Sequence, residues 1–419
     1  MLAVTAVVFY LFAVFGETNT AALTHQEPGT VEPNNDSKSK PASNLADFAL
    51  QKVLNDASPI FGHESDATEP ATATWMKHYP DDTKLVHMNI PGTHDAATWN
   101  YSQATQDALL PITNLNGISE ISPDNFRCQD SSLLASLSGG IRAFDLRYAH
   151  DVTNTSLVFW HGIGLQSQTA TLDSLLFAFY AWLETHPSET LFLSLQFEGN
   201  SIPHSANDVH VQTLLYSALT SPAAKQYIVQ TNTLSTLATA RGKITLLRRF
   251  DLDLLPSSST SSLPGLHFSP RAWTVNGANT TLQYNPSDGT ALAHIQDYYS
   301  PQTPAHSPAS ENIQAKLNAT TAFLSYAASV PLSENDDELF WSFASSTKIG
   351  DSPPSTPRIQ ALGNGSEATP QGGVNEWLGE FLKGMKGKRL GIVMFDFWEK
   401  PEGLLEGFLG LRGLDGGGM

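Results

Sequence analysis

Eight short runs rich in Val, Ile, Leu and Phe recur between residues 86 and 397, and they limit the possible folds more than any other feature of the chain. Runs of this length and composition are typical of strands that are buried on both faces. A sheet of such strands needs helices to cover it. The eight predicted strands are residues 86–90, 141–148, 157–162, 190–197, 243–250, 292–299, 339–345 and 389–397.

Helical patterns fill some of the gaps between these strands. Residues 171–187 begin with a Thr and Asp cap signal, end at a proline and place five apolar side chains on one face. Residues 373–386 form a second predicted helix, with Trp377 on its inward face. Strands that alternate with helices predict an α/β fold, a closed parallel TIM (β/α)8 barrel over residues 70–412. The competing doubly wound sheet is disfavoured, because no GxGxxG or Walker loop follows any strand.

The N-terminal segment differs in composition from the rest of the chain. Its apolar run MLAVTAVVFYLFAVFG is short for a bilayer span, which takes about 20 residues, and polar residues follow it. We therefore expect a secretory signal peptide or short anchor over residues 1–20 and a disordered stalk over residues 21–50. Together with six Asn-X-Ser/Thr sequons, the leader favours a secreted or cell-surface glycoprotein. The sequons begin at Asn35, Asn100, Asn154, Asn279, Asn318 and Asn364.

The charge of the chain argues against some partners. The net charge is −18 and the pI is near 5.0, whereas binding to nucleic acid or to an anionic membrane by charge needs an excess of Lys and Arg. The one cysteine, Cys128, allows neither an intrachain disulfide nor a cysteine-based zinc site. We expect no nucleic-acid partner, and no feature implies a protein partner.

Polar and titratable side chains follow most of the predicted strands. In a barrel of parallel strands the active site forms at the C-terminal ends of the strands. The chain is poor in charge, with 15% Asp, Glu, Lys and Arg, and buried charges are costly unless they pair. The recurrence therefore predicts one site that gathers these groups. They are His94 and Asp95, Asp145 and Arg147, His161, Gln196, Arg249, Asp297 and Tyr299, and Asp396.

Two histidines, an arginine and several carboxylates suit the cleavage of a phosphodiester. One histidine can take a proton from the nucleophile and the other can give one to the leaving oxygen, since an imidazole pKa near ~6.5 permits both. An adjacent carboxylate fixes the imidazole tautomer, and a planar guanidinium matches two phosphoryl oxygens. A serine hydrolase and a zinc enzyme are disfavoured, because neither GxSxG nor HExxH is present.

The motifs and their order resemble a known family. PGTHD (91–95), FDLR (144–147) and WHG (160–162) resemble the X-type catalytic domain of phosphatidylinositol-specific phospholipase C, and the bacterial single-domain kind most. SETLFLSLQFEGN, GKITLLRRF, HIQDYY and GIVMFDFW continue the resemblance to residue 398. It implies an irregular TIM barrel and a two-step reaction. The inositol 2-hydroxyl first expels diacylglycerol to give a 1,2-cyclic phosphate, which is then hydrolysed slowly.

The resemblance also implies the catalytic roles. His94 is the general base on the 2-hydroxyl, and Asp396 orients it. His161 is the general acid on the glycerol oxygen, Asp95 is its partner, and Arg147 contacts the phosphoryl group. Because successive residues of an extended turn point apart, we expect His94 and Asp95 to pair with residues of different strands.

Head-group recognition falls to three residues of the same motifs. Arg249 and Asp297 are expected to bind the inositol hydroxyls by hydrogen bonds, and Tyr299 to stack on the ring. Arg248 and Tyr298 are the alternatives one residue away.

Two positions bear on phosphate binding and on metals. Bacterial relatives often have a lysine where SLQFEG places Gln196, so one positive charge is lost there. In the calcium-dependent members of the family, carboxylates assemble a cation site near position 147. Here the guanidinium of Arg147, braced by Asp145, takes the place of that cation. We therefore expect no metal and no other cofactor.

The expected partner is an inositol phospholipid or a GPI head group at a membrane interface. Because the chain is acidic, apolar side chains rather than basic patches are expected to touch the membrane. Trp99, Tyr101, Trp273 and Trp341 are the candidates, with a place in the core as the alternative for each.

Two other functions stay open. The first is a metal-dependent phosphodiesterase on the same barrel, glycerophosphodiesterase-like or sphingomyelinase-D-like. Such an enzyme needs a Glu cluster near the first histidine, and PGTHD and FDLR lack that cluster. A catalytically silent protein that binds inositol lipid or a GPI glycan is compatible with Gln196.

Overall fold

The computed structural model describes residues 44–64, 68–113, 122–201, 206–284, 291–332, 338–348, 355–366, 369 and 372–410. The predicted leader, residues 1–20, lies outside the described residues, and so does the predicted stalk as far as residue 43. The end of that stalk is helical, because helix α1 (Leu45–Phe61) begins there. Among the described residues no helix is both long enough and apolar enough to cross a membrane.

Helix α1 packs on the barrel, so the folded unit begins before the predicted boundary at residue 70. Its last turn is buried against helix α4 (Leu172–Thr185), where the rings of Phe61 and Phe179 meet edge to face with centroids 5.5 Å apart. The side chains of Leu45 and Phe48 in its first turns remain exposed. Composition alone therefore did not distinguish this start from the polar segment before it.

Eight parallel strands of the described residues follow one another around an incomplete barrel. Their order is β7-β6-β5-β2-β1-β11-β10-β9, so the first and last of them along the chain are neighbours. Strand β8 (Thr280–Gln283) pairs antiparallel with β9, and among the described residues no ladder joins β8 to β7. The predicted α/β fold, an irregular TIM barrel, is confirmed. The eight parallel strands are β1 (Ile90–Thr93), β2 (Ala143–His150), β5 (Leu191–Phe197), β6 (Ile244–Arg249), β7 (Leu266–His267), β9 (Leu292–Gln296), β10 (Leu339–Phe343) and β11 (Ile392–Phe395).

The predicted third strand, residues 157–162, is not a strand of the barrel. Strand β3 (Leu157–His161) pairs antiparallel with the far end of β2 and with β4 (Gly164–Leu165), so it extends a hairpin beyond the parallel strands. The eighth place belongs to β7, whose two residues are too few to form a pattern in the sequence. The first strand begins later than predicted, because residues 85–87 form a 3-10 turn.

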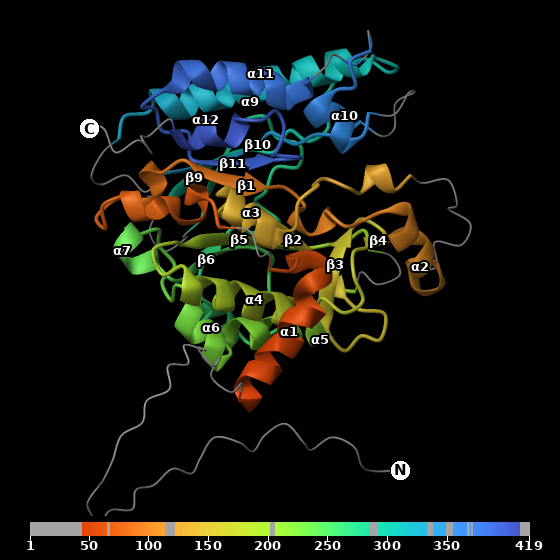
Figure 1. Cartoon of the computed structure of the whole chain (residues 1–419), viewed down its shortest axis with the longest axis vertical. Helices are drawn as coiled ribbons and strands as arrows, with labels where there is room; N and C mark the ends of the chain where they lie inside the picture. The colour runs from red at the N-terminus through yellow and green to blue at the C-terminus, as the bar shows by residue number, and fades with distance from the viewer. Residues whose placement is uncertain are drawn as a thin grey trace, which may run out of the picture. The chain divides into compact units, whose positions relative to one another are not determined.

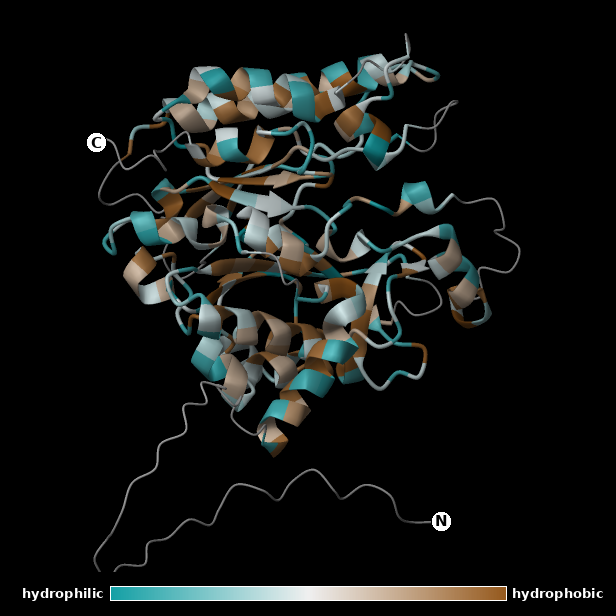
Figure 2. Ribbon diagram, viewed as in Figure 1, coloured by the Kyte–Doolittle hydropathy of each residue, from teal (hydrophilic) through white to brown (hydrophobic). Residues whose placement is uncertain are grey.

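Helices lie outside the strands (Figure 1). Helices α9, α11 and α12 cover β9, β10 and β11, whereas α1, α4 and α6 lie on the side of β2, β5 and β6. The strands are mostly hydrophobic and the outer helices mix polar with apolar residues (Figure 2), as one buried face per helix requires. The remaining helices are α2 (Gln103–Thr113), α3 (Leu133–Gly139), α5 (Val209–Thr220), α6 (Pro222–Tyr227), α7 (Leu237–Ala240), α8 (Ser257–Ser261), α9 (Ala309–Ser329), α10 (Pro357–Leu362), α11 (Gly373–Leu382) and α12 (Leu404–Gly410), with 3-10 segments at Ala71–His78, Leu85–His87, Ala96–Thr98, Pro123–Asn125 and Lys383–Met385.

Both predicted helices are present, and one of their faces was predicted wrongly. Helix α4 begins with a capping box in which the side chains of Thr171 and Ser174 each accept from the other's backbone N–H, at 3.1 and 3.0 Å. Its five apolar side chains are buried as expected. In α11, Trp377 is 49% exposed, because the buried face is formed by Val374 and Leu378 one turn apart.

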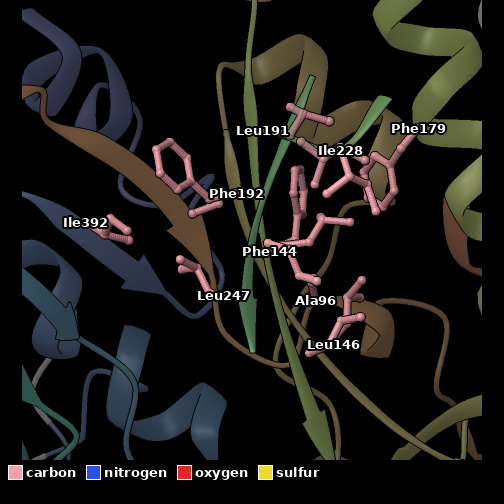
Figure 3. Close-up of a cluster of buried hydrophobic side chains, with 14 of the residues drawn as sticks. Ala96, Phe144, Leu146, Phe179, Leu191, Phe192, Ile228, Leu247 and Ile392 are labelled. Carbon is pink, nitrogen blue, oxygen red and sulfur yellow. The ribbon is translucent and has the colours of Figure 1, made fainter. Parts of the chain in front are cut away.

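Side chains alternate between the interior of the barrel and the layer beneath the helices (Figure 3). Phe144 of β2 packs against Phe179 of α4, with ring centroids 5.3 Å apart. Phe192, Leu247 and Ile392 lie on the other side of the strands. Because successive residues of a strand point to opposite faces, this alternation determines which residues further along each strand point into the barrel.

Gly92 of β1 faces the crowded interior. A Cβ at this position would lie 2.4 Å from Met394 Sδ and 2.8 Å from Ala143 Cβ. Glycine therefore lets β1 fit between its neighbours β2 and β11. Any larger residue would move the turn that carries His94.

A buried ion pair at the N-terminal ends of β2 and β5 yields a stability prediction. Neither Arg142 nor Glu189 is exposed, and Glu189 Oε2 accepts from Arg142 Nε at 2.9 Å and Nη2 at 2.8 Å. Glu189→Ala leaves the guanidinium buried without its counterion, so we expect a loss of about 3 to 5 kcal/mol in the free energy of unfolding by denaturant. The exposed control Asp82→Ala should change it by about 0.5 kcal/mol or less. Equal losses in the two variants would contradict this role.

Candidate active site

Most residues predicted at the strand ends share the inner face of the barrel. Arg147 of β2 is opposite Gln196 of β5, and Gln196 is opposite Arg249 of β6. Arg249 follows Leu247 by two residues, and Asp396 follows the interior Met394 by two. Residues two apart on a strand point the same way. These side chains therefore lie together on the inner face of the barrel, at the C-terminal ends of its strands.

His94 follows β1 and is held between a carboxylate and a guanidinium. Its backbone N–H donates to the carbonyl of Phe395 at 3.1 Å. Its Nδ1 lies 2.9 Å from Asp396 Oδ1, and its Nε2 lies 2.8 Å from Arg147 Nη2. A guanidinium only donates, so Nε2 accepts and Nδ1–H donates to Asp396. This neutral tautomer has its basic lone pair at Nε2.

Asp95 turns back into the same space as His94, contrary to the expectation that the two residues point apart. Its backbone is left-handed, with φ 41° and ψ 54°, a conformation that residues other than glycine rarely adopt. Oδ2 lies 3.2 Å from His94 Nε2 and 3.1 Å from His161 Nε2, and Oδ1 lies 2.9 Å from Arg147 Nε. Asp95 is therefore the partner predicted for His161, and it contacts His94 as well.

His161 reaches the site from the hairpin of β3 rather than from a barrel strand. Its Nδ1–H donates to the carbonyl of Phe126 at 2.8 Å, which leaves Nε2 toward Asp95. The rings of His94 and His161 are nearly perpendicular, with centroids 6.3 Å apart. Both imidazoles thus direct Nε2 at one space.

Arg147 contacts the imidazole of His94 and is surrounded by carboxylates. Asp145 Oδ2 is 3.4 Å from Nη2, and Glu198 Oε2 is 3.9 Å from Nη1. Glu198 was not assigned a role from the sequence, although it follows Gln196 by two residues and so has the same orientation. The side chains of His94, His161 and Arg147 are 12%, 18% and 19% exposed. The reactive groups are therefore reachable, while the carboxylates behind them are buried.

Burial and the guanidinium keep both imidazoles neutral. Burial lowers the pKa of His94 well below its usual value, and the positive charge of Arg147 adds to this effect. Burial, followed by Arg147, lowers the pKa of His161 to about 4. Burial raises the pKa of Asp95, and Arg147 opposes that increase. At pH 7 both histidines of the free protein therefore lack the second proton.

A second group lies around Arg249, where head-group recognition was predicted. Arg249 Nη2 is 3.5 Å from Asp297 Oδ2, and Arg249 Nη1 is 3.6 Å from Asp145 Oδ1. The ring of Trp273 covers the guanidinium at 3.8 Å and donates its Nε1–H to Asp297 Oδ2 at 2.7 Å. No pattern in the sequence indicates this role of Trp273, because its loop has no strand pattern. Tyr299, by contrast, is 39% exposed.

Gln196 lies between the two arginines of the site. Register places it opposite Arg147 on one side and Arg249 on the other. Its Oε1 is buried and has no hydrogen-bond partner among the described residues. An acceptor without a donor at this place is suited to a ligand hydroxyl.

Two of the four aromatic side chains predicted to touch a membrane belong to the core. Tyr101 is 2% exposed and Trp341 is 0% exposed, so neither reaches a surface. Trp99 is partly buried and donates its Nε1–H to the carbonyl of Ile60 at 2.8 Å. Trp273, also partly buried, covers Arg249.

Three side chains of the site have candidate ligand atoms close enough together to bind a metal ion, but their chemistry disfavours metal binding. Candidate ligand atoms of His94, Asp95 and Cys128 lie within 4.8 Å of one another. Burial raises the pKa of the Cys128 thiol well above its usual value, and only a thiolate binds metals well. Arg147 Nη2 lies 2.8 Å from His94 Nε2, so a fixed positive charge faces the same position. These residues therefore do not fit a cation.

The electrostatic origin of the low histidine pKa values can be tested by NMR. Arg147→Gln removes a positive charge that disfavours both imidazolium ions, so we expect the pKa of His94 and that of His161, near 4 in the unaltered protein, to rise. Histidine titration of the ¹⁵N-labelled protein measures both values, with the exposed His210 as the internal control. Values that stay the same in the variant would show that Arg147 does not set them.

No protein-family model matches the chain, but individual proteins do. The chain is 30% identical over 182 residues to a 1-phosphatidylinositol phosphodiesterase of Listeria monocytogenes, which covers 42% of this chain and 48% of that protein. It is 22% identical over 286 residues to the enzyme of that name from Staphylococcus aureus, covering 64% of this chain and 79% of that protein. The chain thus matches about half the length of the first of these relatives. A mouse PI-PLC X domain-containing protein 1 is 26% identical over 163 residues, covering 36% and 46%.

Solved structures agree in fold. A mutant of the phosphatidylinositol-specific phospholipase C from Staphylococcus aureus superposes with a TM-score of 0.62 at 18% identity, covering 83% of this chain and 100% of that one. The enzyme from Listeria monocytogenes gives a TM-score of 0.53 at 22% identity, covering 83% and 99%. The predicted resemblance is confirmed: in sequence and in fold, this chain is similar to phosphatidylinositol-specific phospholipase C and its X-domain relatives.

Proposed function

We propose that the chain is a phosphatidylinositol-specific phospholipase C-like phosphodiesterase that cleaves the glycerol–phosphate bond of inositol phospholipids or GPI anchors without a metal. One observation carries the proposal. Asp95 Oδ2 lies 3.2 and 3.1 Å from the Nε2 atoms of His94 and His161, and a guanidinium nitrogen lies 2.8 Å from the first of them. A base, an acid and a phosphate-binding cation therefore converge.

In the first step His94 acts as the base. Its Nε2 takes the proton of the inositol 2-hydroxyl, whose oxygen attacks phosphorus, and Asp396 at 2.9 Å stabilises the imidazolium that forms. The bond between phosphorus and the glycerol oxygen breaks, and His161 gives that oxygen its proton. The products are diacylglycerol and inositol 1,2-cyclic phosphate, and no water is consumed.

Substrate binding prepares His161 to act as the acid. In the free protein, burial and Arg147 hold its pKa at about 4. A bound phosphodiester carries a negative charge that Arg147 attracts, and this charge favours the imidazolium. Arg147 then leaves His94 Nε2 free for the hydroxyl. The acid is thus charged chiefly when the anionic substrate is present.

The head-group contacts support a substrate without extra phosphates. Arg249 is already shared by Asp145 and Asp297, with N–O distances of 3.6 and 3.5 Å. Hydroxyl groups can bind to such pairs without adding charge, whereas a further phosphate would repel the carboxylates. The role of Tyr299 is proposed as stacking on the inositol from its partly exposed position.

Two alternatives remain distinguishable. A metal-dependent phosphodiesterase would lose its activity with a chelator, and the thiol of Cys128 and the charge of Arg147 argue against it. A silent binding protein would bind inositol without turnover. The unsatisfied acceptor of Gln196, in place of a lysine, is the feature compatible with it.

We also propose that the protein is secreted or at the cell surface. The support is the apolar leader together with the sequons. The asparagines of the five sequons within the described residues are all exposed, so each is accessible to a glycosylating enzyme.

The activity is tested by phosphorus NMR of the purified protein with phosphatidylinositol vesicles and EDTA. We expect the signal of inositol 1,2-cyclic phosphate to appear at the same rate with and without chelator, since Arg147 supplies the positive charge. Loss of product with EDTA would favour the metal-dependent alternative. Binding of inositol without any product would favour the silent one.

The roles of the two histidines are tested by alanine variants. His94→Ala and His161→Ala should each reduce kcat by about 100-fold or more, the usual contribution of a general base or acid, with retained inositol binding. His210→Ala, an exposed histidine outside the site, is the matched control and should leave turnover unchanged. Near-normal turnover in either site variant would refute the proposed pair.

A further inference from the structure

Lys316 on helix α9 is a buried lysine that none of the steps above uses. Its side chain has 0% exposure. Its Nζ donates to the carbonyl of Tyr298 at 3.0 Å and lies 3.5 Å from Gln296 Oε1. Within the part of the chain that the structure describes, no carboxylate oxygen lies within ion-pairing distance of Nζ. A buried ammonium bound only by neutral groups reduces stability.

Lys316 places its charge beside the active site, on the side covered by helix α9. It reaches the end of β9, where Asp297 follows Gln296, and α9 packs on β9 and β10. Its charge acts on Asp297 and on Asp396, the two carboxylates whose fields act on it in return. It also acts on His94. Lys316 therefore links the head-group carboxylate with the carboxylate that orients the base.

The charges of the site explain why a third cation is useful there. Arg147 and Arg249 are the guanidiniums in contact with the site carboxylates. Carboxylates in excess raise one another's pKa values, so some of them would become protonated. A protonated Asp396 could no longer stabilise an imidazolium on His94. The carboxylates of the site are Asp95, Asp145, Glu198, Asp297 and Asp396.

We propose that Lys316 is a positioning residue whose ammonium favours the ionised forms of Asp396 and Asp297 and, through the carbonyl of Tyr298, holds Asp297 in place. Its kinetic consequence rests on the function proposed above, and its electrostatic consequence does not. Burial lowers the pKa of Lys316 to about 7, while Asp297 and Asp396 oppose that decrease. The supporting charge is therefore present below pH 7 and is lost above it.

The same pKa determines how stability depends on pH. In the unfolded chain the lysine has its ordinary pKa of 10.5, and in the folded protein it has a value of about 7. Between these values the unfolded state binds the additional proton, so the stability gained by folding rises with pH. Below pH 7 the buried charge reduces stability. Replacing Lys316 by an uncharged residue should thus stabilise the protein at pH 6, and the same replacement should lower the activity of the site.

The test compares Lys316→Met with Lys316→Gln and with the control Lys225→Met, an exposed lysine of α6. Met fills the same volume without a charge, and Gln restores a donor for the carbonyl of Tyr298 without a charge. We expect kcat/KM on phosphatidylinositol to fall about tenfold at pH 6 in both site variants. A tenfold fall corresponds to a rise of about one unit in the carboxyl pKa that governs the acidic limb of the pH profile. At pH 9, where Lys316 is neutral in the unaltered protein, the difference should disappear. Lys225→Met should show neither effect.

Two further measurements do not need turnover. Carbon NMR of the aspartate carboxyl groups should show a higher pKa for Asp396 and Asp297 in Lys316→Met, and denaturation at pH 6 should show a higher midpoint. If the unaltered protein never cleaves inositol lipid, the proposed function fails, and these two results still decide the role of Lys316. A loss of activity that is equal at pH 6 and pH 9, rescue by Gln, or unchanged carboxyl pKa values would overturn the inference.

Discussion

The carboxylate of Asp95 is the interaction on which the rest of the site depends. It contacts Arg147 through one oxygen and both imidazoles through the other, with the three distances between 2.9 and 3.2 Å. These contacts require a left-handed backbone at a residue that is not glycine, which costs about 1 to 3 kcal/mol. Thr98 holds the turn, because its hydroxyl donates to the carbonyl of Asp95 at 2.8 Å and accepts from the N–H of Cys128 at 2.9 Å. The strained backbone thus brings the proposed acid, the proposed base and the guanidinium of Arg147 together.

Closure of the barrel between β1 and β11 brings a carboxylate to His94, the proposed base. The register of these strands brings Asp396 beside His94, although 302 positions separate them in sequence. Asn375 of α11 donates to the carbonyl of Asp396 at 2.9 Å and so holds the end of β11. On the far side, among the described residues, no ladder joins β7 to β8, and the loop with Trp273 crosses to Asp297 there. The closed side therefore carries the residues proposed for the proton transfers, and the open side carries those proposed for head-group recognition.

Much of the fold and of the site could be predicted from the sequence. Seven of the eight apolar runs overlap parallel strands of the barrel, because strands buried on both faces have a distinctive composition. Their ends carry Arg147, Gln196, Arg249 and Asp396, and alternation along a strand is enough to place such side chains on one face. The order of PGTHD, FDLR and WHG indicated which family the chain resembles. Strand β7 could not be predicted, because two residues form no pattern, and Trp377 was misplaced, because the contact face of α11 depends on the helices beside it.

The sequence by itself therefore determined the class of fold, the set of titratable groups and the chemistry that such a set performs. Only the tertiary structure decided how these groups pair. Asp95 serves both histidines because one backbone angle is left-handed, His161 arrives from a hairpin outside the barrel, and Trp273 and Lys316 come from a loop and a helix that have no strand pattern. Local patterns record which face of an element is apolar. They do not record the distances between elements, and it is these distances that set the charges and the pKa values of the site.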